Sequence, residues 1–198
     1  PRVLSFWETM PFWTVFWKSL GYHVKISPES TRKMYENGLS AVASDTVCFP
    51  AKLVHGHVRS LAEMGVDRIF MPSVTTVKSE NTEATSQSMC AVVKGYPIVM
   101  RNSDDPEKRW GIPFDAPLFH WYTDEDRERQ LTAYMKDKFG ISGSHVKAAI
   151  AAGDKAQKQF KEELLKAGEE VTQEQITAAA KAITDAIAAL KNRPTTKP

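Results

Sequence analysis

Two cysteines, Cys48 and Cys90, are the residues of this sequence best suited to bind a metal or to act as nucleophiles. Cys48 lies in the segment Ser44 to Pro50, and Pro50 is expected to begin a helix. Because the start of a helix carries partial positive charge, this position favours the thiolate form of cysteine. The alternative interpretation is that Cys48 is a small buried residue, which is common for free cysteines.

Cys90 follows a polar segment, residues 75–88, and precedes an apolar run. Two thiols so far apart in the sequence can form a disulfide, share a metal, or have unrelated roles, and their spacing does not choose among these. Zinc and iron–sulfur sites ordinarily take about four protein ligands. Cys48 and Cys90 therefore leave any such site incomplete unless histidine, solvent or another segment contributes.

Two histidines lie shortly after Cys48, at His55 and His57. A helix would separate Cys48 from His55 by about 10 Å along its axis, which is too far for the hydrogen bond that activates a nucleophile. His55 and His57 would point about 200° apart on that helix, so they are poorly placed to bind one ion. His57 shares the apolar face of the predicted helix, and we expect it to be a buried histidine whose nitrogens are hydrogen-bonded.

The composition is that of an ordinary globular protein of 198 residues, with 42% hydrophobic and 25% charged residues. The formal net charge of +2 provides no electrostatic drive toward nucleic acid or an anionic membrane. No apolar run approaches the roughly 20 residues of a membrane-spanning helix. The low cysteine content favours a reducing, cytoplasmic location. The chain opens at Pro1, which indicates a piece of a longer polypeptide.

The first part of the chain alternates short apolar runs with helical patterns, which is typical of a mostly parallel sheet in an α/β fold. We therefore predict a Rossmann-like layered sheet, and the expected strands are residues 3–6, 22–26, 67–74 and 90–94. The expected helices between them cover residues 9–21, 31–38 and 50–65, and a turn is expected at residues 95–97. No phosphate-binding loop of the type G-x-x-x-x-G-K-[ST] or G-x-G-x-x-G occurs.

The second part of the chain is predicted to be helical, because it has no proline between Leu118 and Arg193. Expected helices cover residues 123–139, 144–167 and 172–190, and the polar tail 192–198 is expected to be frayed. These patterns divide the chain into an α/β domain, residues 1–122, and a C-terminal helical extension, residues 123–198.

Several sequence blocks together resemble one protein family. The most specific block runs from Ser44 to His57 and surrounds Cys48, and the others are Met10 to Trp13, Leu20-Gly21, Val66 to Pro72 and Gly95 to Pro97. They are similar to the CoA enzyme activase region of large fused proteins related to activators of 2-hydroxyacyl-CoA dehydratases. The resemblance covers about residues 1–170 and is densest over residues 44–72.

The resemblance implies an α/β domain that contributes cysteines from separate loops to a four-iron cluster, 4Fe-4S, as in the dehydratase subunits. Cys48 matches the first cysteine of the family region and Cys90 the next, with Ala91 in place of the usual following proline. The helix from Ser144 resembles the family helix that precedes a second α/β lobe, which is not in this sequence. The resemblance also implies an ATPase domain of the acetate-kinase/sugar-kinase/Hsp70 type elsewhere in the same fused chain.

Three functions follow as hypotheses from the sequence. The first is an electron-transfer domain that carries an iron–sulfur cluster through Cys48 and Cys90, reduces a dehydratase or other redox partner, and is inactive alone. The second is a non-catalytic scaffold that docks an ATPase domain or a dehydratase, with both cysteines structural. The third is a thiol-dependent enzyme that uses Cys48, for which rapid alkylation is expected.

Overall fold

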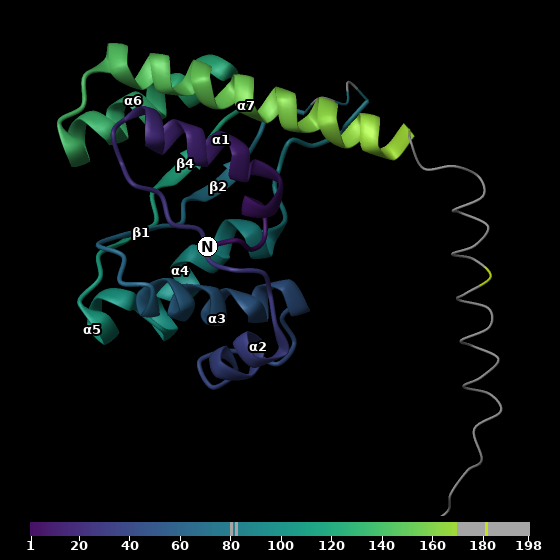
Figure 1. The fold of residues 1–198 in the computed structure, drawn as a ribbon, viewed down its shortest axis with the longest axis vertical. Coiled ribbons are helices and arrows are strands. Elements are labelled where there is room, and N and C mark those ends of the chain that lie inside the picture. Colours follow the sequence, from purple (N-terminus) through teal and green to yellow (C-terminus); the bar gives the residue numbers. More distant parts are fainter. Residues whose placement is uncertain (80, 82, 170–180, 182–198) are drawn as a thin grey trace, which may run out of the picture. The chain divides into compact units, whose positions relative to one another are not determined.

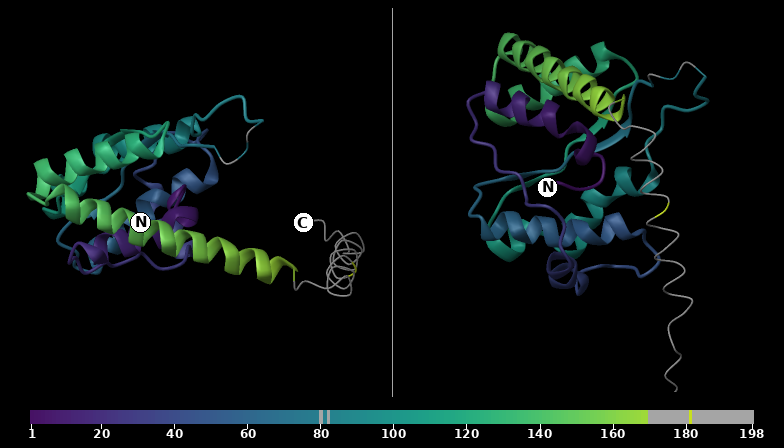
Figure 2. Two further views of the ribbon diagram at one scale, coloured as in Figure 1. Left: turned by 90° about the horizontal axis from the view of Figure 1, so that it is seen from above. Right: turned by 45° about the vertical axis from the view of Figure 1, so that its right-hand side comes forward.

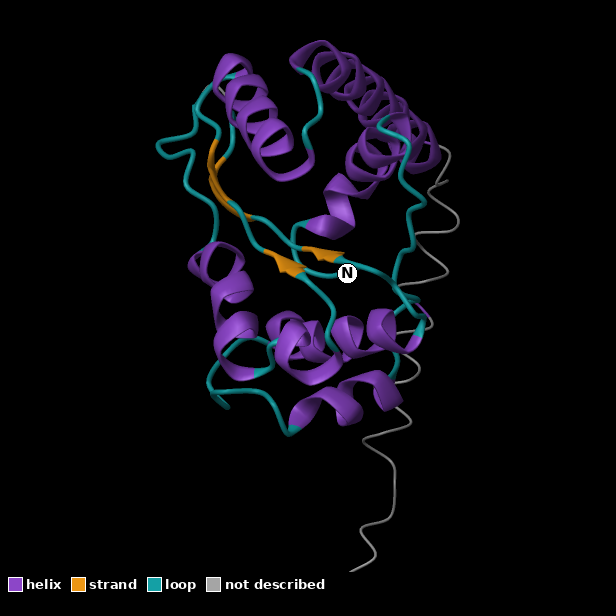
Figure 3. Cartoon of the chain, turned by 90° about the vertical axis from the view of Figure 1, so that its left-hand side faces the viewer, coloured by secondary structure: helices purple, strands orange, loops and turns teal. Residues whose placement is uncertain are grey.

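A computed structural model describes residues 1–79, 81, 83–169 and 181 of the chain. Pro1–Gln157 form one compact unit, and the residues described from Lys158 onward belong to a second. In the first unit, two layers of helices enclose a narrow layer of strands (Figures 1 and 3). The first helical layer contains α1 (Phe6–Ser19), α6 (Asp124–Phe139) and the beginning of α7 (Gly143–Glu169). The second contains α2 (Arg32–Leu39), α3 (Phe49–Glu63), α4 (Ala91–Ser103) and α5 (Pro106–Trp110).

The strands form one parallel ribbon in two short pieces. β1 (Ile69–Phe70) pairs with β3 (Phe114–Asp115), and β2 (Ser73–Thr76) pairs with β4 (Leu118–His120). Both pairs begin in the same register, and the hydrogen bonds continue from one to the next: the N–H groups of Ile69, Met71 and Ser73 donate to the carbonyls of Pro113, Asp115 and Pro117. The ladder weakens between the two pairs because Pro117 has no N–H to donate back.

Parallel pairing in an α/β fold is confirmed, but the described residues contain much more helix than sheet. Three expected strands are wrong. Residues 3–5 lead directly into α1, residues 22–26 are extended without a strand partner, and Cys90 precedes α4. The run after Cys90 is helical because Tyr96 and Met100, one turn apart, are both buried. The expected turn at residues 95–97 is also wrong, because it lies inside α4.

Two of the correctly predicted helices begin at a threonine that caps them. Thr31 accepts a hydrogen bond from the Met34 N–H and precedes α2, and Thr123 accepts one from Asp126 and precedes α6. The helix predicted from Ser144 is α7, which begins at Gly143. The helix predicted over residues 172–190 and the tail 192–198 lie outside the described residues.

α6 and the beginning of α7 belong to the main core of the first unit. Figure 2 shows α1 alongside the start of α7, where a Cβ on Gly153 would approach the Phe12 ring to 2.7 Å. Leu131, Met135 and Val146 are fully buried in the same core. A division of the chain between residues 122 and 123 stays a prediction. In the described part of the chain, no helix is long and apolar enough to cross a lipid bilayer.

His57 is the buried, hydrogen-bonded histidine that the sequence predicts. Its side chain is fully buried in α3, with Nδ1 2.8 Å from Ser27 Oγ and Nε2 2.9 Å from Ser30 Oγ. Burial lowers the pKa of His57 to about 4, and the positive charge of Arg2 contributes further. His57 is therefore neutral in the folded protein at neutral pH, and it ties the loop before α2 to α3.

Acid is expected to destabilise the fold through His57. Between about pH 6.5 and pH 4 the unfolded chain protonates this histidine while the folded chain does not, so stability present above this window is lost as the pH falls, by about 3 kcal/mol. Urea unfolding at several pH values measures this loss. His57→Asn and His57→Gln should flatten the pH dependence, whereas the exposed control His23→Asn should keep it. A wild-type pH profile in both His57 variants would contradict the expectation.

Candidate functional site

Both cysteines stand immediately before a helix. Cys48 is the N-cap residue of α3 and Cys90 is the N-cap residue of α4, and neither side chain caps its helix by a hydrogen bond. Both are exposed and form no disulfide. The interpretation of Cys48 as a buried apolar residue is therefore wrong. Each thiol is open to solvent at the electropositive end of a helix of more than three turns.

The pairing of α3 with α4 brings the two cysteines to the same end of the second helical layer. His55 of α3 contacts Tyr96 of α4 at 3.1 Å, and Arg59, one turn later in α3, contacts Asp104 at the end of α4 at 3.5 Å. Later residues of one helix thus contact later residues of the other, so the helices run parallel. In Figure 1 both begin on the right-hand side. Cys48 and Cys90 each lie about 10 Å before the His55–Tyr96 contact.

The same end of the layer coincides with the carboxyl ends of the strands. The chain leaves β2 and returns in a hairpin, in which Thr76 pairs with Ser88 and the Met89 N–H donates to the Thr75 carbonyl at 2.8 Å. This hairpin places Cys90 beside the end of β2. In open α/β folds, ligands bind at the carboxyl ends of parallel strands. The structure therefore brings Cys90 to the edge where function is expected in such folds.

His120 is a residue at this edge that the sequence analysis did not single out. It is the last residue of β4, and its exposed ring contacts the Thr75 hydroxyl through Nδ1. Gln130 holds the His120 backbone by accepting from its N–H at 2.9 Å and donating to its carbonyl at 2.7 Å. The sequence feature that could have identified His120 is its position directly after an apolar run, because a polar residue there is typical of a strand end.

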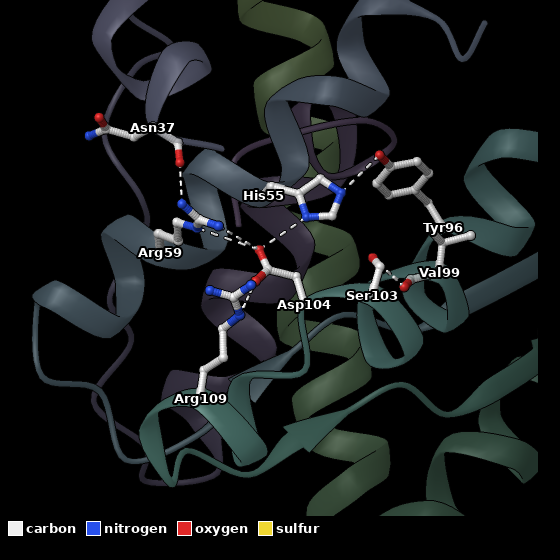
Figure 4. A network of polar contacts seen from close by, with 8 residues as sticks. All are labelled: Asn37, His55, Arg59, Tyr96, Val99, Ser103, Asp104 and Arg109. Carbon is white, nitrogen blue, oxygen red and sulfur yellow. Dashed lines mark hydrogen bonds and ion pairs between the residues drawn. The ribbon is translucent and has the colours of Figure 1, made fainter. Parts of the chain in front are cut away.

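A buried polar network beneath the thiols holds α3 against α4. We call it the Asp104 network; Figure 4 shows its residues, Asn37, His55, Arg59, Tyr96, Asp104 and Arg109. The Asp104 carboxylate is fully buried and contacts His55 Nδ1 at 3.1 Å, Arg59 Nε at 3.5 Å and Arg109 Nε. Arg59 also donates to the Asn37 carbonyl of α2. One carboxylate therefore joins the ends of α3, α4 and α5, and Arg59 extends the connection to α2.

The electrostatics fix the direction of the hydrogen bonds in this network. Burial lowers the pKa of His55 although Asp104 opposes the shift, so the imidazole is neutral at neutral pH. Because the Asp104 carboxylate only accepts, His55 Nδ1 is the donor and Nε2 accepts from the Tyr96 hydroxyl. Burial, with a smaller effect of negative charge at Cys48, raises the pKa of Tyr96 to about 12. The Tyr96 hydroxyl thus stays protonated and lies within electrostatic reach of the Cys48 thiol.

The packing of α2 on α3 positions the segment that leads to Cys48. The two helices cross at glycines: a Cβ on Gly38 would lie 2.6 Å from the Gly56 backbone nitrogen, and a Cβ on Gly56 would lie 2.7 Å from Met34 Cγ. Backbones this close leave no room for a side chain between them. The loop from the end of α2 to Cys48 therefore starts from a fixed position on α3.

The donor set around the cysteines is small. Among the described residues, no group of three or more histidine, cysteine, aspartate or glutamate side chains is close enough to hold a metal ion. The donors near this end include the two thiols and, at the strand edge, the His120 ring. Whether Cys48 and Cys90 bind a metal stays a prediction.

Comparison with known protein families gives a match over most of the chain. A family model described as "CoA enzyme activase uncharacterised domain" (DUF2229) matches residues 1–191. No curated protein and no solved structure matches the chain significantly.

Proposed function

The chain belongs to the CoA enzyme activase uncharacterised domain family, and on that premise we propose that it supplies two ligands, Cys48 and Cys90, to an iron–sulfur cluster that transfers electrons. The family resemblance identified in the sequence is confirmed, over residues 1–191. The family description names no cofactor, so the cluster rests on the chemistry of the site.

One observation carries the proposal: two free, exposed thiols begin two parallel helices, at the carboxyl end of a parallel ribbon. An iron–sulfur cluster is held by cysteine thiolates, and its thiolate-rich anionic site is stabilised by the positive ends of helices. In an α/β fold, the loops at the carboxyl ends of the strands converge on one site, so cysteines from separate loops can lie close together there. Lys94, one turn into α4, adds a positive charge at the same end.

The donor set fits part of such a cluster. Four thiolates hold a 4Fe-4S cluster, and this chain has two cysteines. We propose that the remaining ligands come from another lobe or chain, and that this chain alone has no turnover. In the full protein, an ATPase domain of the acetate-kinase/sugar-kinase/Hsp70 type would supply ATP hydrolysis, and a dehydratase would accept the electrons.

The residues of this chain have separate tasks in that proposal. Cys48 and Cys90 provide sulfur ligands, and the first turns of α3 and α4 place partial positive charge beside the anionic cluster that they would hold. The Asp104 network keeps the two helices parallel, so that their first turns stay at one end. A bound cluster would supply the one-electron chemistry, which the side chains themselves do not provide.

Anaerobic reconstitution with ferrous iron and sulfide tests the proposal on the fused protein. Wild-type protein should gain a visible sulfur-to-iron charge-transfer band, and Cys48→Ser and Cys90→Ser should each lower the bound iron of this centre by about tenfold, because a hydroxyl is a much poorer ligand for a cluster. Ser40→Ala, at an exposed serine directly after α2, is the control and should leave the iron content unchanged. Equal iron in wild type and both serine variants would refute the assignment.

A docking scaffold is the second candidate, and the surface beside Cys48 favours it. Phe49 is 58% exposed, Leu39 is 41% exposed, and the Phe49 ring lies 5.1 Å from the Tyr35 ring. Such exposed apolar groups beside a site are common in protein interfaces. A fused protein that stays colourless after reconstitution but loses its ATPase partner in Phe49→Ser would support this candidate over the first.

A further inference from the structure

A cavity of about 610 Å³ lies far from the two cysteines. It opens between α1, the extended residues 22–26 and β1, and it reaches Leu61 near the end of α3. Cys48 is at the opposite end of α3, which is about 20 Å away along the helix. The cavity has the size of an ordinary small-molecule pocket, about 300–1,000 Å³. The proposed function does not use it.

The wall of the cavity is aromatic. Trp13, Trp17, Tyr22 and Phe70 all line it. The Phe70 ring lies 4.9 Å from Trp13 and 5.0 Å from Trp17, and Trp17 contacts Tyr22 at 5.1 Å, all edge to face. These contacts fix the rings without a ligand, so the wall is preformed. A flat apolar molecule would gain both dispersion and ring contacts there.

The charges at the rim favour a neutral ligand. Lys25 donates to the Met64 carbonyl at 2.6 Å, and Arg68 donates to Asp115 at 2.8 Å. Arg68 is neutralised by Asp115, whereas Lys25 keeps its charge beside a neutral carbonyl and is balanced by the Asp67 carboxylate at the rim. The charges of these four side chains sum to zero, so they give no net attraction for an anion or a cation, and a neutral molecule would displace none of these contacts.

One backbone position offers a polar contact inside this apolar surface. The ribbon uses the N–H groups of Ile69 and Met71 to pair with the other strand. Successive residues of a parallel strand point their N–H and carbonyl groups to opposite edges of the strand. The N–H and carbonyl of Phe70 therefore point away from β3, toward the edge of β1 that has no strand partner because residues 22–26 form no strand there. Phe70 lines the cavity, so a ligand carbonyl can accept from its N–H.

We propose that this cavity binds a neutral, flat aromatic molecule with a carbonyl acceptor, held by the rings of Trp13, Trp17 and Phe70 and by the Phe70 N–H. The pocket chemistry favours a neutral molecule that carries an acceptor over one that lacks it. The proposal is independent of the cluster, because the cavity shares no residue with the cysteine site.

Titration with prodan, a neutral naphthyl ketone, tests the proposal on the purified chain. We expect saturable binding with a blue-shifted emission and energy transfer from the tryptophans. Val24→Trp narrows the cavity and should weaken binding by about tenfold. Val42→Trp is the matched control, because it places the same ring at another half-buried loop valine outside the cavity, and it should bind prodan as wild type does.

A second probe isolates the hydrogen bond. 2-Dimethylaminonaphthalene lacks the ketone of prodan, and its binding should be about three- to tenfold weaker, as expected for one lost hydrogen bond. Failure of wild type to saturate with prodan, or equal binding by Val24→Trp and Val42→Trp, would overturn the site. Equal affinity for the two probes would overturn the contact with Phe70. Thermal unfolding of each variant shows whether it remains folded.

Discussion

Asp104→Ala is expected to lower the free energy of unfolding by about 3–5 kcal/mol, measured by urea or thermal unfolding. The carboxylate is fully buried between Arg59, Arg109 and His55. Its removal leaves two guanidinium groups near the end of α4 without their counter-charge. The mostly buried Arg59 is then left poorly solvated and the fully buried His55 loses its acceptor, whereas the half-exposed Arg109 stays in contact with water.

Two comparison variants separate charge from shape at this position. Asp104→Asn keeps the size and some hydrogen bonds but removes the charge, so we expect an intermediate loss. Asp45→Ala removes an exposed carboxylate in the loop before Cys48 and should change stability by less than about 0.5 kcal/mol. A loss below about 1 kcal/mol in Asp104→Ala would show that the network does not hold the helices together.

The network also explains what the sequence alone leaves undetermined. A helix start depends on neighbours within four residues, so Thr31 and Thr123 predict α2 and α6 from local chemistry. Asp104 contacts His55 and Arg59 only when α3 and α4 are packed together, and no local sequence pattern predicts such a contact. The residue pattern likewise does not predict that the two cysteine-bearing helices begin at the same end of the layer, because this follows from that packing.

The expected strands failed for a related reason. A short apolar run fits both a strand and a buried helical turn, and only the partner decides. Residues 22–26 have an alternating pattern but no strand beside them to supply hydrogen bonds, so they remain an extended loop. The run from Val92 continues at helical spacing through Tyr96 and Met100, and both are buried in α4. The helical spacing over residues 92–100 therefore decided the structure of this segment, and the short apolar run at residues 90–94 did not form a strand.

Gly56→Ala is expected to destabilise the protein by about 3 kcal/mol or more, because the added Cβ has no space. It would lie 2.7 Å from Met34 Cγ and 2.8 Å from the Met34 carbonyl carbon, and it would overlap the carbonyl oxygen. The backbone of α2 cannot turn aside as a flexible side chain can. Relief therefore requires α2 to move away from α3, and the start of the loop to Cys48 moves with it.

Gly95→Ala is the matched control for this prediction. Gly95 lies inside α4, and a Cβ there would meet nothing within 4 Å. Alanine is the better helix former, so this variant should gain up to about 1 kcal/mol of stability. The same chemical change thus has opposite signs at the two glycines, and urea unfolding of both variants measures them together. Equal stability of Gly56→Ala and Gly95→Ala would contradict the close crossing of α2 and α3 in solution. The Asp104 network alone would then have to set the position of the Cys48 loop.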